Sequence, residues 1–430
     1  MNPAQPTFLL DSYRFSWPED GIEILVDRLR EHRGELQCEM SVRTTIPPYA
    51  GLLRQANFNL SAARPRTEWA NDLGRRIDLD WHDVIEQACV LSLRRWREGE
   101  PIVDLTEVEP RQKEAFLLPP FIVEGAASGI FADGGTGKSL FALAAALSVA
   151  TGEAILGVYP ERLCPVLYLD WEWDAEAHAE RLQALCAGAG IDPPKEMIWY
   201  RHELASALES APTVRQLIGQ HGIGLVVVDS LGFARGGEPE SAELTIKLFA
   251  TFRTYGVPVL FVDHVAKHST DRQHSFGSVY TRNSARLMWR IDAQDEVIGS
   301  SRLLGLVNTK SNLRLQRPRG LRLLIGADDD GRLQTVRFES CDPLSMVGFE
   351  KSLTLRDQLI RIIKANGPGE VEDLRARLLG LDVKASTSTI RGKLGTFKGV
   401  FAHGESGWGL LENRVAGLDE GDPVDRSGSL

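Results

Sequence analysis

The chain holds 430 residues and carries a net charge of -10, which leaves room for two or three domains. With 43% hydrophobic and 25% charged residues, its composition excludes a disordered or fibrous protein. The negative charge excludes a basic coat over the whole surface, so any contact with nucleic acid has to come from local patches.

Targeting signals are not recognisable in the sequence. The N-terminus lacks the pattern of a cleavable signal sequence, and no apolar run approaches the roughly 20 residues of a membrane-spanning helix. The 5 cysteines are scattered and form no Cys-x-x-Cys pair, which favours reduced thiols. We therefore expect a cytoplasmic protein that does not bind a membrane.

Residues 1–100 are predicted to form a small α+β module. Alternation of apolar and polar residues at 22–26 and 35–43, on either side of a polar turn, is typical of a β-hairpin. A third strand is expected at 56–60, and helical spacing predicts a helix that begins near Trp81. We find no catalytic constellation in this module.

Basic residues gather between Arg64 and Arg76. Contact with nucleic acid or a partner is one interpretation, and a solvent-exposed charged face is the favoured one. After the module, residues 101–120 are rich in Glu, end in two prolines and are predicted to be a linker.

The segment from Ser128 to Ala150 has the order of a strand, a glycine-rich loop and a helix. Its central stretch reads Ala-Asp-Gly-Gly-Thr-Gly-Lys-Ser at 132–139 and opens into a run rich in Ala and Leu. Such a loop surrounds phosphates with backbone N–H groups, and the new helix adds its partial positive charge. The sequence therefore predicts a nucleotide site at Gly134, Gly135, Thr136, Gly137, Lys138, Ser139 and Leu140.

The two residues after the glycines have the specific roles of a P-loop. Lys138 is predicted to reach the β- and γ-phosphates of ATP, and the Ser139 hydroxyl to bind Mg²⁺. The first position of the pattern holds Ala132, where a P-loop has Gly. A glycine-rich surface turn is the alternative, but such turns are rarely followed by so apolar a helix.

From 121 to 340, apolar strands alternate with helices. Runs rich in Val and Leu end at Asp170, Asp229 and His264, and further strands are expected between 286 and 326. This alternation predicts an α/β fold with a mostly parallel sheet covered on both faces. Ligands bind such sheets at the carboxyl ends of the strands, where these polar residues lie.

Hydrolysis of ATP needs a metal-binding carboxylate and a base that activates water. Asp229 is the expected second Mg²⁺ ligand beside Ser139. Because Ser230 and not an acid follows Asp229, the base has to come from elsewhere, and Glu172 on a neighbouring strand is predicted for this role. Asp170 is the second candidate for the base.

His264 is expected to hydrogen-bond the γ-phosphate and to sense its loss, because it ends the strand that follows Asp229. A lone His is more often structural, so this prediction rests on its place in the chain. A polar loop with Lys267 and Arg272 comes next. A loop that begins at a phosphate sensor is well placed to move with hydrolysis.

Residues 350–412 are predicted to form a winged helix-turn-helix. Helical spacing at 353–364, 370–379 and 386–397 is followed by a short hairpin. In this motif the third helix enters the major groove of DNA, so the candidate contacts are Ser386, Thr387, Thr389, Arg391, Lys393 and Lys398. Docking of a protein is the alternative. Disorder is expected at 413–430.

The central segment, about 121–315, resembles the RecA-like ATPases, and within them the hexameric helicases that include the plasmid replicative helicase RepA and bacterial DnaB. The resemblance rests on four motifs, at 132–139, 166–172, 226–230 and 262–267. It implies a RecA-like P-loop fold and a hexameric ring with ATP bound between subunits. It also implies Glu172 as the base and His264 as the sensor.

A cation from the neighbouring subunit is also implied at the site. Arg282, Arg286 and Lys310 are the candidates, and Lys310 best matches the strand-end position that the family uses. We do not choose among the three from the sequence.

Contacts with single-stranded DNA are implied at two loops, 233–243 and 266–284, which would face the channel of the ring. Lys267 and Arg272 are the candidate DNA-binding residues there. The flanking segments do not match those of DnaB, and no primase motif is present.

We therefore expect a Mg²⁺-dependent ATPase that forms a homo-hexamer and acts on DNA as a helicase or translocase. Single-stranded DNA is expected in the channel and duplex DNA at the winged helix. The main alternative is an ATP-gated DNA-binding or scaffold protein of a mobile element or defence system, without unwinding. A recombinase-type filament is the third.

Overall fold

The computed structural model of the chain describes residues 3–9, 12–99, 102–110, 115–238, 241–265, 279–295, 301–313, 316–343, 346, 349, 353–381 and 383–411. The chain forms two compact units. One contains Met1–Arg290, Asn308–Gln316 and Ile325–Arg337, and the other Ile291–Val307, Arg317–Leu324 and Phe338–Leu430. None of the helices in these described ranges is both long and apolar enough to cross a membrane.

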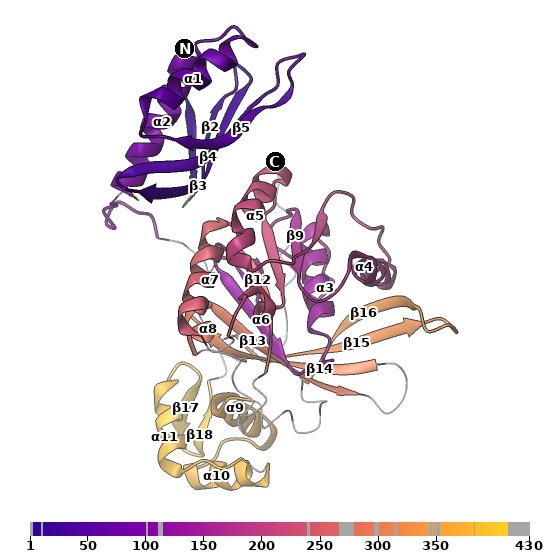
Figure 1. Cartoon of the computed structure of the whole chain (residues 1–430). Coiled ribbons are helices and arrows are strands. Elements are labelled where there is room, and N and C mark those ends of the chain that lie inside the picture. Colours follow the sequence, from indigo (N-terminus) through magenta and orange to yellow (C-terminus); the bar gives the residue numbers. More distant parts are fainter. Residues whose placement is uncertain are drawn as a thin grey trace, which may run out of the picture. The chain divides into compact units, whose positions relative to one another are not determined.

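The N-terminal segment is a five-stranded antiparallel sheet in chain order, followed by two helices (Figure 1). Its elements are β1 (Gln5–Leu9), β2 (Ser12–Trp17), β3 (Ile22–His32), β4 (Glu35–Thr44), β5 (Gly51–Asn59), α1 (Ala63–Gly74) and α2 (Trp81–Glu98). β3 and β4 pair as the predicted hairpin. Their alternate residues, such as Ile24 and Met40, are buried in one core with the helices.

The basic residues of this segment lie in and just after α1, a helix that the sequence analysis did not predict. Arg64 pairs with Glu68 of the same helix, and Arg66 pairs with Glu86 of α2. Both side chains are therefore engaged with carboxylates, but only that of Arg64 is exposed to solvent, at 89% against 19% for Arg66.

A nine-stranded sheet follows, in the order β10, β9, β11, β12, β8, β13, β14, β15, β16. The strands are β8 (Ala127–Ala132), β9 (Val166–Asp170), β10 (Ile198–His202), β11 (Leu225–Asp229), β12 (Val259–His264), β13 (Leu287–Asp295), β14 (Ser301–Ser311), β15 (Arg319–Ala327) and β16 (Leu333–Cys341). All neighbours from β10 to β13 pair in parallel, whereas β14 and β15 pair antiparallel. The predicted mostly parallel sheet is thus confirmed. β10 and β16 were not predicted.

Helices cover both faces of the parallel strands (Figure 1). α3 (Lys138–Thr151) and α4 (Ala175–Ala189) lie on one face; α5 (Ala207–His221), α6 (Leu231–Ala234) and α7 (Ala242–Thr254) lie on the other. α8 (Val279–Ser284) precedes β13. Every residue of β9 and β11 is buried, which explains why these strands read as continuous apolar runs.

The end of the predicted linker is folded. β6 (Phe116–Leu118) pairs with β7 (Ile122–Val123), and Leu117 and Leu118 are fully buried. The Trp289 indole donates a hydrogen bond to the Pro120 carbonyl, so this hairpin packs against the sheet. The expectation of a linker up to residue 120 was therefore wrong for its last residues, because these apolar side chains have a core to enter.

The C-terminal segment contains three helices and a hairpin: α9 (Leu355–Asn366), α10 (Val371–Gly380), α11 (Thr387–Thr396), β17 (Phe401–Gly404) and β18 (Gly407–Leu410). A single bridge joins Gly369, between α9 and α10, to Trp408 of β18. Leu359, Leu374, Ile390 and Phe401 bring all of these parts into one small core. The tail predicted at 413–430 lies outside the described residues.

Candidate active site at the carboxyl edge of the sheet

The loop between β8 and α3 has the backbone of a phosphate cradle. Gly135 and Gly137 have φ angles of 73° and 97°, a left-handed conformation that favours glycine. A Cβ on Gly134 or Gly135 would meet no atom within 4 Å, so one side of the loop is open. Gly137 is the N-cap of α3 and gives the first turn no side-chain acceptor. This arrangement suits an anion at the helix N-terminus.

Lys138, at the start of α3, bends back over the loop that precedes it. Its Nζ donates to the carbonyl oxygens of Ala132 and Asp133 at 3.1 and 2.8 Å. Burial lowers the pKa of Lys138, and the surrounding carboxylates of Asp229 and Glu172 oppose that shift. An ammonium group held by two carbonyls is ready to exchange them for phosphate oxygens.

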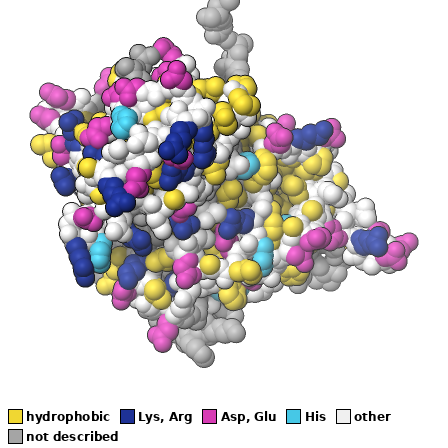
Figure 2. All heavy atoms as spheres, turned by 45° about the horizontal axis from the view of Figure 1, so that its top comes forward, with side chains coloured by type: hydrophobic (Ala, Val, Ile, Leu, Met, Phe, Trp, Pro, Cys, Tyr) yellow, Lys and Arg dark blue, Asp and Glu magenta, His cyan; other side chains and the backbone are white. Residues whose placement is uncertain are grey.

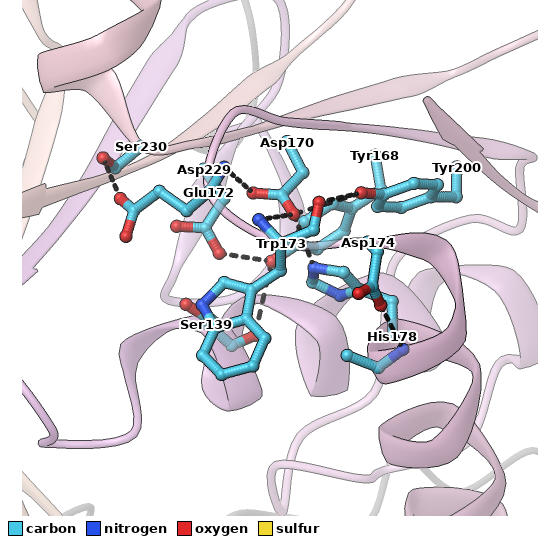
Figure 3. A network of polar contacts seen from close by, with 11 residues as sticks. Ser139, Tyr168, Asp170, Glu172, Trp173, Asp174, His178, Tyr200, Asp229 and Ser230 are labelled. Carbon is cyan, nitrogen blue, oxygen red and sulfur yellow. Dashed lines mark hydrogen bonds and ion pairs between the residues drawn. The ribbon is translucent and has the colours of Figure 1, made fainter. Parts of the chain in front are cut away.

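Asp229 ends β11 on the face of the sheet that α3 covers. It is buried, and its Oδ2 accepts a hydrogen bond of 2.7 Å from the Tyr168 hydroxyl (Figure 3). Burial raises the pKa of Asp229, and hydrogen bonds from Tyr168 and Ser139 oppose this. The Ser139 hydroxyl and the Asp229 carboxylate therefore lie together, and such hard oxygen atoms are the ligands that Mg²⁺ prefers.

Glu172 lies two residues beyond β9, the strand next to β11. Its Oε1 accepts a hydrogen bond of 2.5 Å from the Ser230 hydroxyl and lies 3.8 Å from Nε2 of His264. His264 first, and then Ser230, lower the pKa of Glu172, although burial opposes them. The carboxylate is thus ionised at neutral pH and lies beside the ends of β11 and β12, the next two strands of the sheet.

Asp170, the second candidate for the base, has a different role in the structure. Its side chain is buried and accepts hydrogen bonds from the amides of Glu172 and Trp173, from Tyr200 and from His178. The Asp170 side chain is 1% exposed, so water has little access to its oxygen atoms. The structure therefore favours Glu172 over Asp170 as the base.

His264 ends β12 and is half-exposed, at the same edge as Lys138 and Asp229. The structure thus places Lys138, Ser139, Asp229, Glu172 and His264 together, as the sequence predicts. Lys267 and Arg272, in the loop after His264, lie outside the described residues.

The three cations expected for a neighbouring subunit form one cluster. Lys310 Nζ donates to the carbonyl oxygens of Arg282, Asn283 and Ala285 at the end of α8. The Arg282 guanidinium donates to the Thr309 carbonyl at 3.0 Å. Burial lowers the pKa of Lys310, with a further contribution from the two arginines. Arg282 and Arg286 are both exposed, whereas Lys310 is partly buried.

The predicted DNA contacts of the C-terminal segment divide into two groups. The Ser386 side chain caps α11 by accepting from the Thr389 amide, so it has a structural role. Arg391, Lys393 and Lys398 are exposed on or just after this helix.

Four residues of the site were not singled out from the sequence: Tyr168, His178, Tyr200 and Ser230. Tyr168 had a recognisable signal, since a hydroxyl two residues before Asp170 in a strand points to the same face. His178 and Tyr200 had none, because only the packing of α4 and β10 beside β9 brings them in.

Comparison with known proteins supports this assignment for part of the chain. Residues 98–270, less than half of the sequence, match a protein family described as AAA domain. This segment includes the phosphate loop, Glu172, Asp229 and His264. With the mostly parallel sheet and the loop geometry, the match supports a P-loop nucleotide-binding domain in this part of the chain.

No curated protein matches the sequence. Among solved structures, the chain is similar to the crystal structure of a KaiC-like protein from the hyperthermophilic archaeon Pyrococcus horikoshii OT3. The two share 17% identity, with 53% of this chain and 98% of that chain covered, and a TM-score of 0.36.

A buried carboxyl group next to the site makes stability depend on pH. Asp263 precedes His264, and its Oδ1 accepts from the His264 amide at 2.9 Å. Its Oδ2 is buried, with no hydrogen-bond partner found in the part of the chain that the structure describes. Burial raises the pKa of Asp263 to about 7.

Replacing Asp263 with Asn should stabilise the protein at high pH. An unfolded Asp titrates at about 3.9, so the folded state holds the extra proton between that pH and about 7 and loses stability as pH rises through this window. We expect the melting temperature of Asp263→Asn to exceed the parent's at pH of about 8, with a smaller difference at about 4.5. An equal difference at both pH values would contradict the raised pKa.

Proposed function

We propose that the chain is a Mg²⁺-dependent ATPase that assembles as a homo-hexamer and acts on DNA as a helicase or translocase. The observation that carries the proposal is the convergence of Lys138, Ser139, Asp229, Glu172 and His264 at the carboxyl ends of four adjacent strands. These are the groups that phosphoryl transfer to water requires: phosphate-binding donors, metal ligands and a carboxylate for the nucleophile.

Each side chain has a role in the proposed hydrolysis. The open loop and Lys138 bind the phosphates, and Ser139 and Asp229 hold Mg²⁺, which neutralises charge on the phosphates when bound. Glu172 orients the attacking water and accepts its proton. His264 lies 3.8 Å from Glu172, which supports its role in relating the state of the site to the loop that follows.

Assembly into a ring is supported by the cation cluster at α8 and β14. Lys310 is engaged by three carbonyl groups and the Arg282 guanidinium donates to the Thr309 carbonyl, so we propose exposed Arg286 as the residue that reaches the site of the neighbouring subunit. A guanidinium contributed in this way stabilises charge on the transferred phosphoryl group.

Two observations favour DNA as the partner. The C-terminal segment has the element order of a winged helix, including the bridge between Gly369 and Trp408. Its residues 353–411 contain 9 Lys and Arg against 6 Asp and Glu, in a chain of net charge -10. On the face drawn in Figure 2, by contrast, basic and acidic side chains are interspersed. We propose that α11 contacts duplex DNA through Arg391, Lys393 and Lys398.

Substitutions at the phosphate loop and at the base test the ATPase. Glu172→Gln should bind ATP normally but lower the turnover number on the order of 100-fold, because the amide cannot accept a proton. Lys138→Ala should abolish nucleotide binding. The rate of ATP hydrolysis is measured with and without single-stranded DNA. The mass of the particle is measured in each nucleotide state. Wild-type turnover in Glu172→Gln would refute the assignment of the base.

The same measurements distinguish a DNA helicase or translocase, referred to as the motor, from a regulatory or scaffold ATPase. Stimulation by single-stranded DNA together with a hexameric mass supports the motor. Turnover that ignores DNA, or a particle that stays monomeric, favours an ATP-gated regulatory or scaffold protein.

Mixing two inactive chains tests the shared site. The Glu172→Gln variant lacks the proposed base, and the Arg286→Ala variant lacks the guanidinium proposed to reach the neighbouring site. Each variant alone should therefore hydrolyse ATP slowly. In mixed rings, an Arg286→Ala subunit still supplies Glu172 and a Glu172→Gln neighbour supplies Arg286, so turnover should partly return. Full turnover by Arg286→Ala alone would contradict its role.

Charge removal on α11 tests the DNA contact. The double variant Arg391→Ala, Lys393→Ala should bind a duplex more weakly at all sequences, and the slope of log K against log salt should fall by about 1 per lost contact. Arg375→Ala, an exposed residue of α10, is the matched control. Equal affinity of the double variant and the control would argue for protein docking at this helix.

A further inference from the structure

The turn that carries Glu172 is held by one buried carboxylate. Asp170 Oδ1 accepts from the Glu172 amide at 3.1 Å, and Oδ2 accepts from the Trp173 amide at 3.0 Å. The Tyr200 hydroxyl shares its single proton between the Trp173 carbonyl, at 2.7 Å, and the same Oδ2, at 3.2 Å. The direction in which Glu172 leaves the sheet therefore depends on the orientation of the Asp170 side chain.

His178 of α4 completes this set of contacts. Its Nε2 lies 2.9 Å from Asp170 Oδ2, and both side chains are almost entirely buried, at 5% and 1% exposure. An ionised carboxylate only accepts hydrogen bonds, so Nε2 carries the proton. The ring lies 4.8 and 5.0 Å from the rings of Tyr168 and Tyr200, measured between centroids (Figure 3).

We propose that His178 is a positioning residue for the reaction: it fixes the Asp170 carboxylate and, through it, the Glu172 turn. The proposal rests on the proposed hydrolysis of ATP. His178 touches neither the phosphate loop nor Glu172 in the contacts described, and it acts through the two amides that Asp170 accepts.

The charge of the pair supports this role. Burial alone raises the pKa of Asp170, but the hydrogen bonds from His178 and from the Glu172 and Trp173 amides outweigh it and lower the pKa. A neutral carboxyl group would carry an O–H and accept hydrogen bonds more weakly than the carboxylate does. Loss of the His178 donor therefore weakens the geometry that holds Glu172, without removing any group that binds ATP.

Three substitutions distinguish this role from simple packing. His178→Phe keeps an aromatic ring between Tyr168 and Tyr200 but has no donor, whereas His178→Gln keeps a donor at the corresponding distance along the side chain. We expect His178→Phe to lower kcat roughly tenfold with a change in the KM for ATP of less than about twofold, and His178→Gln to recover most of that loss. His221→Phe, on α5 beside Trp199, is the control and should keep parental kcat.

A double-mutant cycle identifies the residue through which His178 acts. In a Glu172→Gln background, His178→Phe should cause no further loss of the residual turnover. If His178→Phe does not fold, Tyr200→Phe removes another donor to Asp170 and should lower kcat in the same direction.

Opposite results overturn the inference. Parental kcat in folded His178→Phe, or an equal loss in the Glu172→Gln background, would show that His178 does not position Glu172. Equal kcat of the Phe and Gln variants would assign the effect to packing. These outcomes differ from failure of the proposed function, which is indicated only when Glu172→Gln itself retains turnover.

Discussion

Parallel pairing of β9, β11, β12 and β8 is the constraint on which the site depends. In a parallel sheet, carboxyl ends meet at one edge, and the register places Asp229 directly opposite Asp170. Groups from four separate segments therefore gather at one edge of the sheet. The phosphate loop alone specifies binding of an anion, whereas the neighbouring strand ends supply the metal ligand, the carboxylate and the imidazole.

The site also depends on which hydrogen-bond donors surround three buried aspartates. Burial raises the pKa of Asp229 and Asp263, while Asp170 has a lowered pKa although burial opposes it. The difference follows from the donors: Asp170 accepts from two amides, an imidazole and a hydroxyl. Asp170 is thereby a fixed structural anion. Asp229 has fewer donors, which leaves its oxygen atoms suited to a cation.

Much of this site was predictable because its signals are local. Glycine before Lys138 and Ser139, and polar residues after apolar runs, reflect the backbone requirements of a loop and the burial of a strand. The choice between Glu172 and Asp170 was not local, since both follow the same strand. Contacts from α4 and β10 decided it, by surrounding Asp170 with donors.

The sequence by itself determined the mostly parallel sheet, the phosphate loop and five of the side chains that meet beside it, because hydrophobic periodicity and glycine placement act over a few residues. Only the tertiary structure decided which neighbours those side chains acquire. Lys310 is engaged by carbonyl groups of α8 and Arg286 is exposed, although both are cations near strand ends. His178 and Tyr200 reach Asp170 through packing of elements distant in the chain, and residue spacing carries no information about such contacts.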